Sequence, residues 1–161
     1  MTATAHDAND THEQSGLEKF HFDTSHVDWK DFITTGCYYK LLDVNVAART
    51  ADMLVKFEPG ARCLYHRHVA PATSLVLEGE LHIFDQTSSG ETLRTVKPAG
   101  TYTVGVENDV HVEGGGEQGV VVYFSMRGTS DHIYDLLDSE LNLKRRISIH
   151  DFAKDLQHWA S

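Results

Sequence analysis

Three histidines carry the clearest chemical signal in this chain. His66 and His68 are two residues apart, and His111 follows later in the sequence. In an extended strand, residues two apart point to the same face, so His66 and His68 can converge on one ion while Arg67 points away. Neutral imidazole is a common ligand of iron, zinc, copper and nickel, and three imidazoles leave coordination positions open for a reactant. The pattern therefore predicts a metal site held by His66, His68 and His111, with chemistry that acts through the metal.

Other polar residues near these histidines are candidates for the surroundings of the site. Glu113 has the same strand parity as His111, so it could be a carboxylate behind the ligands, a fourth ligand, or a solvated strand end before three glycines. Glu107 shares that parity but lies nearer a loop, and we expect it in the pocket or in solvent. His82 follows Gly79 and is expected in the core, on the surface, or as a hydrogen-bond donor in the pocket.

The segment 119–126, GVVVYFSM, predicts a last strong strand beside the site. Phe124 and Met126 lie on its apolar face, which is the natural lining of the interior. Arg127 follows at the strand end, where it could meet a substrate carboxylate or water. Cys63 has the opposite parity to the histidine pair, so we expect a packed thiol and not a ligand.

Short strands separated by turns are expected to hold these residues. From Cys37 onward apolar residues alternate along several segments, with turn sequences at 59–60, 88–90 and 98–100. This even spacing without a helical pattern indicates an all-β barrel or sandwich. Ser148 is a suitable cap for a helix near the end of the chain. Apolar residues then recur at three- to four-residue steps and predict a short amphipathic helix: Ile149, Phe152, Leu156 and Trp159.

One domain with two tails is expected, because 161 residues with 40% hydrophobic content suit a single globular core. Residues 1–22 are polar without an apolar period and predict a flexible N-terminal arm, which could order on a partner subunit. Residues 23–146 would form the β-barrel domain. Residues 147–161 would form the C-terminal helix, packed on the barrel or on a partner subunit.

Charge and hydropathy exclude two classes of partner. A formal net charge of −10 repels a phosphate backbone, and the basic cluster at 144–146 is too short to outweigh it. No apolar run is long enough to span a membrane, and the N-terminus lacks a signal-peptide pattern. We therefore expect a soluble, cytoplasmic protein without nucleic-acid or membrane partners. In that compartment Cys37 and Cys63 are expected to be free thiols.

Two motifs in this sequence resemble those of the cupin superfamily. The first cupin motif is glycine, five residues, His-x-His, three or four residues, glutamate, six residues and glycine, and here Gly60, the histidine pair and Gly79 are in register. The second motif ends Pro-x-Gly-x-x-His after a glycine. Gly100 and His111 hold its spacing, while Val106 and Asn108 stand where proline and glycine are usual. The resemblance implies a double-stranded β-helix, the cupin jelly roll.

The glutamate of the first cupin motif is replaced by Ala72. The remaining three-histidine set is similar to that of the iron dioxygenases of this superfamily, which include 2,4'-dihydroxyacetophenone dioxygenase and the acetylacetone-cleaving enzyme, and the cupin domain of ChrR-like regulators is also similar. The resemblance implies a mononuclear non-haem iron(II) dioxygenase that cleaves a C–C bond in a chelating hydroxyketone or diketone with O2. Three neutral ligands leave the ion its full charge, which suits a substrate that chelates as an anion.

Two other functions fit the same histidines. One is a non-catalytic metal-binding sensor domain like that of ChrR-like regulators, although this chain lacks an evident sigma-binding module. The other is an isomerase or lyase that uses zinc or manganese as a Lewis acid. Histidine ligation alone does not separate iron(II) from zinc, manganese or nickel. The resemblance also implies a homodimer or a higher even oligomer, which would cover exposed strand edges.

Overall fold

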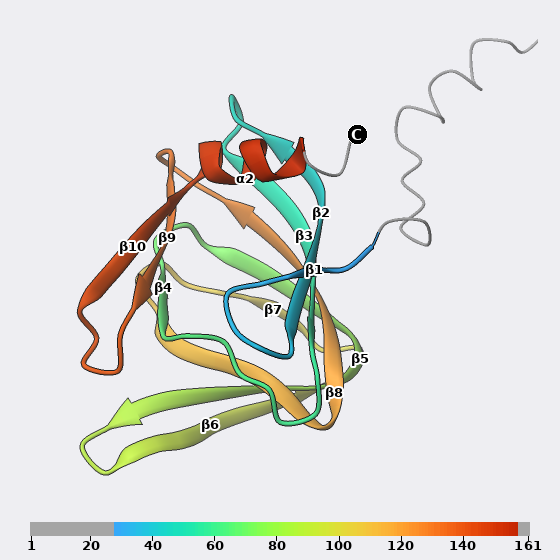
Figure 1. Cartoon of the computed structure of the whole chain (residues 1–161), viewed down its shortest axis with the longest axis vertical. Coiled ribbons are helices and arrows are strands. Elements are labelled where there is room, and N and C mark those ends of the chain that lie inside the picture. Colours follow the sequence, from blue (N-terminus) through green and yellow to red (C-terminus); the bar gives the residue numbers. More distant parts are fainter. Residues whose placement is uncertain (1–27, 158–161) are drawn as a thin grey trace, which may run out of the picture.

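The computed structural model describes residues 28–157, which form a curled sheet of ten strands and one helix (Figure 1). The predicted N-terminal arm, residues 1–22, and Trp159 lie outside the described residues. The elements are β1 (Lys30–Asp31), β2 (Cys37–Asn45), β3 (Thr50–Phe57), β4 (His66–His68), β5 (Ala72–Thr87), β6 (Gly90–Pro98), β7 (Tyr102–Val104), β8 (Val110–Arg127), β9 (His132–Leu137), β10 (Leu143–Ser148) and α2 (Ile149–Leu156). The predicted all-β architecture with one short C-terminal helix is confirmed.

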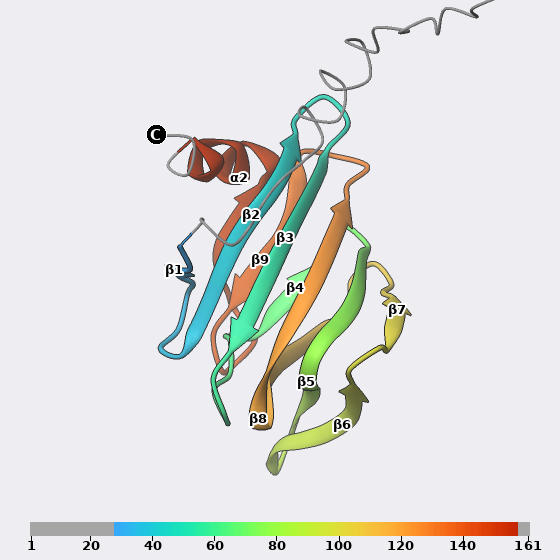
Figure 2. The same cartoon turned by 90° about the vertical axis from the view of Figure 1, so that its right-hand side faces the viewer.

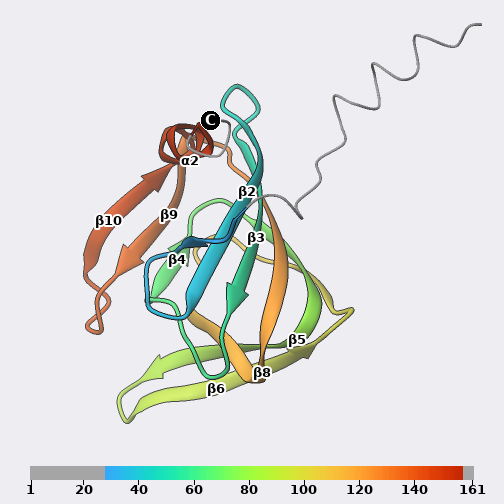
Figure 3. The same ribbon diagram turned by 45° about the vertical axis from the view of Figure 1, so that its right-hand side comes forward.

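The order of the strands is β1-β2-β3-β8-β4-β9-β10, and β5 joins β8 to the two edge strands β6 and β7. Figure 2 shows β2, β3, β8 and β5 side by side as one twisted wall. Figure 3 shows β9 and β10 on the opposite side of the interior, which the sheet reaches by curling through β4. The long strand β8 makes this possible, because its first residues pair with β4 and its last residues pair with β3.

Alternating apolar residues place the core inside this curl. Along β3, Ala51, Met53, Val55 and Phe57 are buried, as their shared parity predicts, while the residues between them are half-buried. The C-terminal half of β8 contributes Phe124 and Met126 to the same core.

Strand β8 is longer than the sequence pattern indicates. It runs without interruption from Val110 through the three glycines to Arg127, so residues 119–126 are only its second half. It is also not the last strand, since β9 and β10 follow. The apolar run around Gly79 is likewise not broken in two: β5 is continuous, with bulges on either side of that glycine. A Cβ at Gly79 would lie 2.1 Å from the carbonyl oxygen of Gly119, so only glycine fits there.

The helix α2 begins where the sequence predicts. Ser148 is its N-cap and forms a capping box with Asp151, in which the Ser148 hydroxyl accepts from the Asp151 N–H and the Asp151 carboxylate accepts from the Ser148 N–H. Ile149 and Phe152 are buried, and the Phe152 ring contacts Tyr134 of β9. No helix among residues 28–157 is long and apolar enough to cross a membrane.

A β-bulge in β6 changes which side chains face the interior. Lys97 pairs with Leu81 and Thr95 with Ile83, but the next pair is Leu93 with Phe84, so Arg94 is the extra residue. Directly opposed residues point to the same face of a sheet. Lys97 and Thr95 therefore share the inward face of two core residues, and the bulge re-aims Arg94.

Candidate metal centre

Neighbouring strands bring the three predicted histidines together. His66 of β4 lies directly opposite His111 of β8, and His68 lies two residues further along β4. Glu113 is two residues beyond His111 on the same face of β8. All four side chains are buried inside the sheet, with exposed fractions of 7–9%. The expected parity of His66 with His68, and of His111 with Glu113, is what the strands provide.

The four side chains form a group that could hold a metal ion, with one ligand atom from each and all four atoms within 4.8 Å of one another. The Nε2 atoms of His66 and His68 are 3.0 Å apart. Oxygens of Glu113 lie 3.7 Å from Nε2 of His66 and 3.5 Å from Nε2 of His111. Two ligands that each lie about 2.1 Å from one ion are separated by about 3.0–3.4 Å, so this spacing fits a shared ion.

Hydrogen bonds leave the ligand atoms of two histidines free. Nδ1 of His66 is 3.0 Å from the carbonyl oxygen of Leu64, and Nδ1 of His111 is 2.7 Å from a carboxylate oxygen of Asp109. Both partners only accept, so each Nδ1 carries the hydrogen and each Nε2 keeps its lone pair. Nε2 of His111 is buried with no hydrogen-bond partner among the described residues, which is the condition of a ligand atom. The residues present therefore fit a metal ion.

A series of charged side chains leads from His111 to the hairpin formed by β5 and β6. Nη1 of Arg94 donates to both carboxylate oxygens of Asp109 at 3.0 Å, while its Nε donates to Asp85 at 2.7 Å. The guanidinium also donates to the carbonyl oxygen of Val110 at 3.1 Å. A carboxylate behind a ligand histidine fixes its tautomer and the orientation of its ring. Asp109 is thus a positioning residue for His111, and Arg94 holds Asp109 in place.

Burial and the neighbouring charges shift the pKa values of these four residues, often in opposite directions. Burial lowers the pKa of His66, and burial together with the neighbouring histidines lowers the pKa of His68 to about 3. Burial also opposes ionisation of Glu113, but its interaction with His111 and the charges of the other two histidines outweigh this and lower its pKa to about 2. For His111, burial lowers the pKa, yet the carboxylates of Glu113 and Asp109 raise it overall. Two histidines are thus held neutral beside an ionised carboxylate, which is the state that ligands require.

Cys63 lies beside the candidate ligands but does not belong to the group that could hold a metal ion. Its Sγ is 3.6 Å from Nδ1 of His66 and accepts the backbone N–H of Glu113 at 3.2 Å. Burial raises the pKa of its thiol well above the usual value, so the sulfur stays protonated. Both Cys63 and Cys37 are free thiols.

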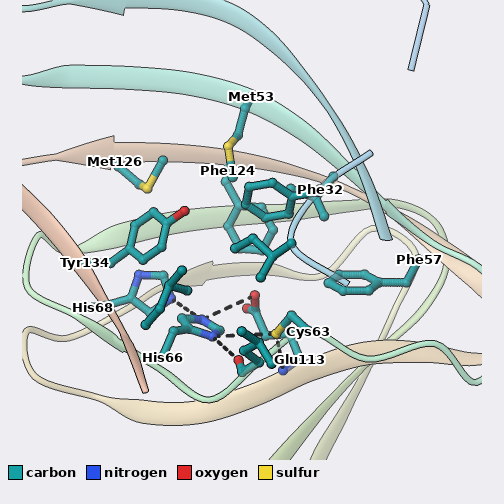
Figure 4. Close-up of a pocket in the computed structure, with 14 residues that line it drawn as sticks. Phe32, Met53, Phe57, Cys63, His66, His68, Glu113, Phe124, Met126 and Tyr134 are labelled. Carbon is teal, nitrogen blue, oxygen red and sulfur yellow. Dashed lines mark hydrogen bonds and ion pairs between the residues drawn. The ribbon is translucent and has the colours of Figure 1, made fainter. Parts of the chain in front are cut away.

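A mostly apolar chamber opens on one side of the four residues, between β3, β8 and β9 (Figure 4). His66, His68 and Glu113 form its floor. Figure 4 shows the aromatic rings of Phe32, Phe57, Phe124 and Tyr134 around it. The other residues of this apolar chamber are Ile33, Met53, Val55, Cys63, Leu64, Met126 and Leu136.

A second chamber opens on the opposite side, toward β6 and β7. His68, Glu113 and Phe124 belong to both chambers, whereas His111 lines only this one. We call it the β6-side chamber. Its remaining residues are Ala72, Ser74, Ile83, Arg94, Thr95, Lys97, Thr103, Val104, Gly105, Val106 and Asp109.

Of the other predicted pocket residues, some line a chamber and some do not. Phe124 and Met126 line the apolar chamber as expected. Glu107 and Arg127 are exposed and line neither chamber. His82 lies outside the site, where its Nε2 is 3.3 Å from a carboxylate oxygen of Glu80.

Glu113 is the main revision of the predicted site. It is buried within continuous β8 and not a solvated strand end, and it belongs to the group of four side chains that could hold a metal ion. Ala72, at the position of the usual cupin glutamate, lines the β6-side chamber instead. The carboxylate among the candidate ligands is thus on β8, at Glu113, whereas the cupin motif has it at the position of Ala72 on β5.

Sequence reasoning missed several neighbours of the ligands. Asp109 could have been found, because it shares the parity of His111 two residues away. Arg94 and Lys97 gave no such signal, since the position of Arg94 depends on the bulge in β6 and that of Lys97 on its pairing with Leu81 of β5. Phe32 and Tyr134 reach the apolar chamber from distant segments.

Comparisons with known proteins agree with this fold. The ChrR cupin-like domain family matches residues 17–130. No curated protein matches the sequence. An acetylacetone dioxygenase from Acinetobacter johnsonii has a similar structure, with a TM-score of 0.70 at 12% identity over 99% of this chain and 98% of that chain.

Two further solved structures are similar. A Methylibium petroleiphilum protein proposed to be an acetylacetone dioxygenase gives a TM-score of 0.69 at 19% identity, over 84% of this chain and 92% of that chain. An RmlC-like cupin protein from Ralstonia eutropha gives 0.69 at 12% identity, over 89% and 90% of the two chains. At these identities the likeness shows the fold, and the predicted double-stranded β-helix is confirmed.

Proposed function

The chain belongs to the family of ChrR cupin-like domains, and from that premise we propose that it is a mononuclear non-haem iron(II) dioxygenase. Its substrate would be a small ketone that chelates the metal through two oxygens, such as a β-diketone or a 2-hydroxyketone. The reaction would break a C–C bond next to a chelated carbonyl, and both atoms of O2 would enter the two products. These would be two carboxylic acids, or one acid and a dicarbonyl compound.

One observation supports an enzyme in particular: the group of four candidate ligands borders two chambers, with His66 in the lining of the apolar one, His111 in that of the β6-side one, and His68 and Glu113 in both. A purely structural metal site is closed by its own ligands, whereas a catalytic site keeps positions open for reactants. The rings around the apolar chamber suit a small organic molecule and limit water near the ion. The likeness in fold to acetylacetone dioxygenases points to the same class of substrate.

The residues of the site would divide the work as follows. His66, His68 and His111 would hold the ion through Nε2, with Glu113 as a fourth ligand or as a nearby acceptor. A bound iron(II) ion supplies Lewis acidity and electrons for the reduction of O2. One carboxylate among the ligands leaves a net positive charge, which still favours the anionic enolate of a ketone. Asp109 would keep Nδ1 of His111 protonated, and Phe124 would separate the two chambers above the ion.

Metal analysis followed by oxygen uptake tests this proposal. Protein purified without added metal should contain close to one equivalent of iron. Loaded with iron(II), it should consume O2 when given acetylacetone or 2,4'-dihydroxyacetophenone, and a variant with His66→Ala should not. Absence of O2 consumption across a panel of chelating ketones would refute the dioxygenase.

The family match itself favours a second candidate, a non-catalytic metal-binding sensor domain. In that case the metal would bind without turnover, and a sigma factor would co-purify in stoichiometric amount from the native cell. A third candidate is an isomerase or lyase with zinc, manganese or nickel as the Lewis acid. Turnover of a ketone in the absence of O2 would favour it over the dioxygenase.

We also propose that two copies of the chain associate through the edge of the sheet. Strand β7 pairs only with β5 within the described residues, so its outer edge is open. The apolar side chains there are solvent-exposed, with exposed fractions of 65% for Tyr102 and Val104 and 68% for Val106. A second copy would cover this edge. Sedimentation should show a dimer or a higher even oligomer, and a monomer at all concentrations would contradict it.

A further inference from the structure

Lys97 stands out among the residues of the β6-side chamber. Its side chain shares the inward face of Leu81, because the two residues are directly paired between β5 and β6. It is half-buried and lines the same chamber as His68, His111 and Glu113. A cation that faces the interior of a protein is normally paired with an acid.

The acids around this chamber do not pair with Lys97. Asp109 is engaged by Arg94 and by His111, and Glu113 faces the histidines. Among residues 28–157, Lys97 forms no ion pair and no hydrogen bond through its ammonium group. Arg94, by contrast, is held by two aspartates. The chamber therefore contains one cation whose charge no described residue compensates, in a chain of net charge −10.

Residues with hydroxyl groups line the same chamber as this cation. Thr95 lies on the same face of β6, two residues before Lys97. Ser74 of β5 and Thr103 of β7 are directly paired across the chamber wall, and the Ser74 side chain is buried. An ammonium group with several hydroxyl donors is a suitable environment for a carboxylate. The apolar chamber on the other side of the ligands offers no comparable group.

We propose that the β6-side chamber is an anion subsite, in which Lys97 binds a carboxylate on the part of the substrate that does not chelate the metal. This inference rests on the proposed function and narrows its substrate class to chelating ketones that carry an acidic tail. The ketone would lie over His68 and His111, with its tail directed toward β6. The opposite, apolar chamber would then receive the uncharged end of the molecule.

A matched pair of ligands tests the subsite. The diketone 4,6-dioxoheptanoate and heptane-2,4-dione have the same carbon chain and the same chelating group, but only the first ends in a carboxylate. Each would be titrated by calorimetry into protein loaded with iron(II) in the absence of O2, so that binding is measured without turnover. We expect the acid to bind about tenfold more tightly or better, as for a hydrogen bond to a charged group.

Two substitutions assign this preference to Lys97. Lys97→Gln should abolish the preference while leaving the affinity for heptane-2,4-dione unchanged, and Lys97→Arg should retain most of it. Lys144→Gln removes the same charge from an exposed position of β10 and should change neither affinity. Unchanged iron content and thermal unfolding in each variant would show that the site and fold are intact.

The possible failures are distinguishable. If both ligands bind with equal affinity to the wild type, or if Lys97→Gln weakens both equally, the anion subsite is refuted and the proposed function stands. If neither diketone binds to the iron-loaded protein, the proposed function is refuted and the subsite with it.

Discussion

The two chambers share a floor but differ in the walls that enclose them. The apolar chamber is bounded by the central strands of the sheet, where Met53, Val55 and Phe57 are at most 5% exposed. The β6-side chamber is bounded by β6 and β7, which each pair only with β5 among the described strands. The polar side chains that β6 contributes to it, Arg94, Thr95 and Lys97, are exposed or half-buried, although buried core residues such as Ile83 also line this chamber. One wall of the site is thus formed by the core of the protein, whereas the other includes edge strands that are attached to the sheet only through β5.

This difference separates stability from recognition. A residue in the apolar wall cannot change without disturbing the packing that holds β3 against β8. The residues that β6 contributes to the opposite wall lie outside the buried core, so their replacement should alter what binds while the fold remains. The candidate metal ligands lie between the two walls and should respond to changes in either.

The largest effect is expected from Phe57→Ala in the apolar wall. Phe57 is 2% exposed, and truncation of a buried phenylalanine lowers the free energy of unfolding by about 3–5 kcal/mol. Thr95→Ala in the opposite wall should change it by no more than about 0.5 kcal/mol. Urea unfolding of both variants measures the contrast. Equal losses would show that the two walls do not differ in this way.

Glu113→Gln changes the floor that both chambers share. The amide keeps the shape but removes the charge that lies 3.5–3.7 Å from two histidines. Loss of a carboxylate that only supports a ligand typically weakens metal binding by about 10–100-fold. We expect Glu113→Gln to lower the affinity for iron(II) by more than this. Glu117→Gln, on an exposed part of the same strand, is the control. Metal titration of both variants measures the effect, and wild-type affinity in Glu113→Gln would exclude a ligand role.

Acidic pH should weaken the same floor in the metal-free protein. The folded pKa of His68, about 3, lies below the ordinary value of 6.5, so the unfolded state binds more protons and stability is lost as the pH falls below 6.5. From pH 6.5 to 5 this amounts to about 2 kcal/mol. Glu113 adds only about 0.2 kcal/mol in this window, since its stabilisation is lost mainly between about pH 4.5 and 2.

Urea unfolding at several pH values in the presence of a chelator measures this slope. The variant His68→Gln should show a smaller slope between pH 6.5 and 5. If wild type and variant have the same slope, His68 is not the group that titrates.

The smallest effect is expected along the chain of charges behind His111. Asp109→Asn retains a hydrogen-bond acceptor for Nδ1 of His111 but loses the charge, and should weaken iron(II) binding by about tenfold. Asp85→Asn, one step further away behind Arg94, should have a smaller effect. If a metal titration shows a larger loss of affinity for Asp85→Asn than for Asp109→Asn, Asp109 is not the residue that positions His111.

Local rules predicted much of the fold and part of the site. Strand parity placed His66 with His68 and His111 with Glu113, because alternation along a strand needs no knowledge of the rest of the chain. The cap at Ser148 is equally local. Asn108 stands where the cupin motif has glycine and adopts a φ of 63°, a conformation that asparagine tolerates better than most residues.

What the sequence did not reveal depends on pairing between distant strands. Three consecutive glycines resemble a strand end, yet in β8 they make room for neighbouring backbone: a Cβ at Gly114 would lie 2.7 Å from the carbonyl oxygen of Ala61. The inward position of Lys97 follows from its pairing with Leu81, and Arg94 faces the site only because of a bulge. Neither register nor bulges can be read from the apolar pattern of β6.

The direct pairing of His66 with His111 also bears on how the protein unfolds. An ion held by both residues would be a cross-link between positions that are 45 residues apart along the chain. Such a link restricts the unfolded ensemble as a disulfide does, by the entropy of closing the intervening loop. Removal of the metal would then lower the free energy of unfolding, and the cell's metal supply would help to determine what fraction of this protein is folded.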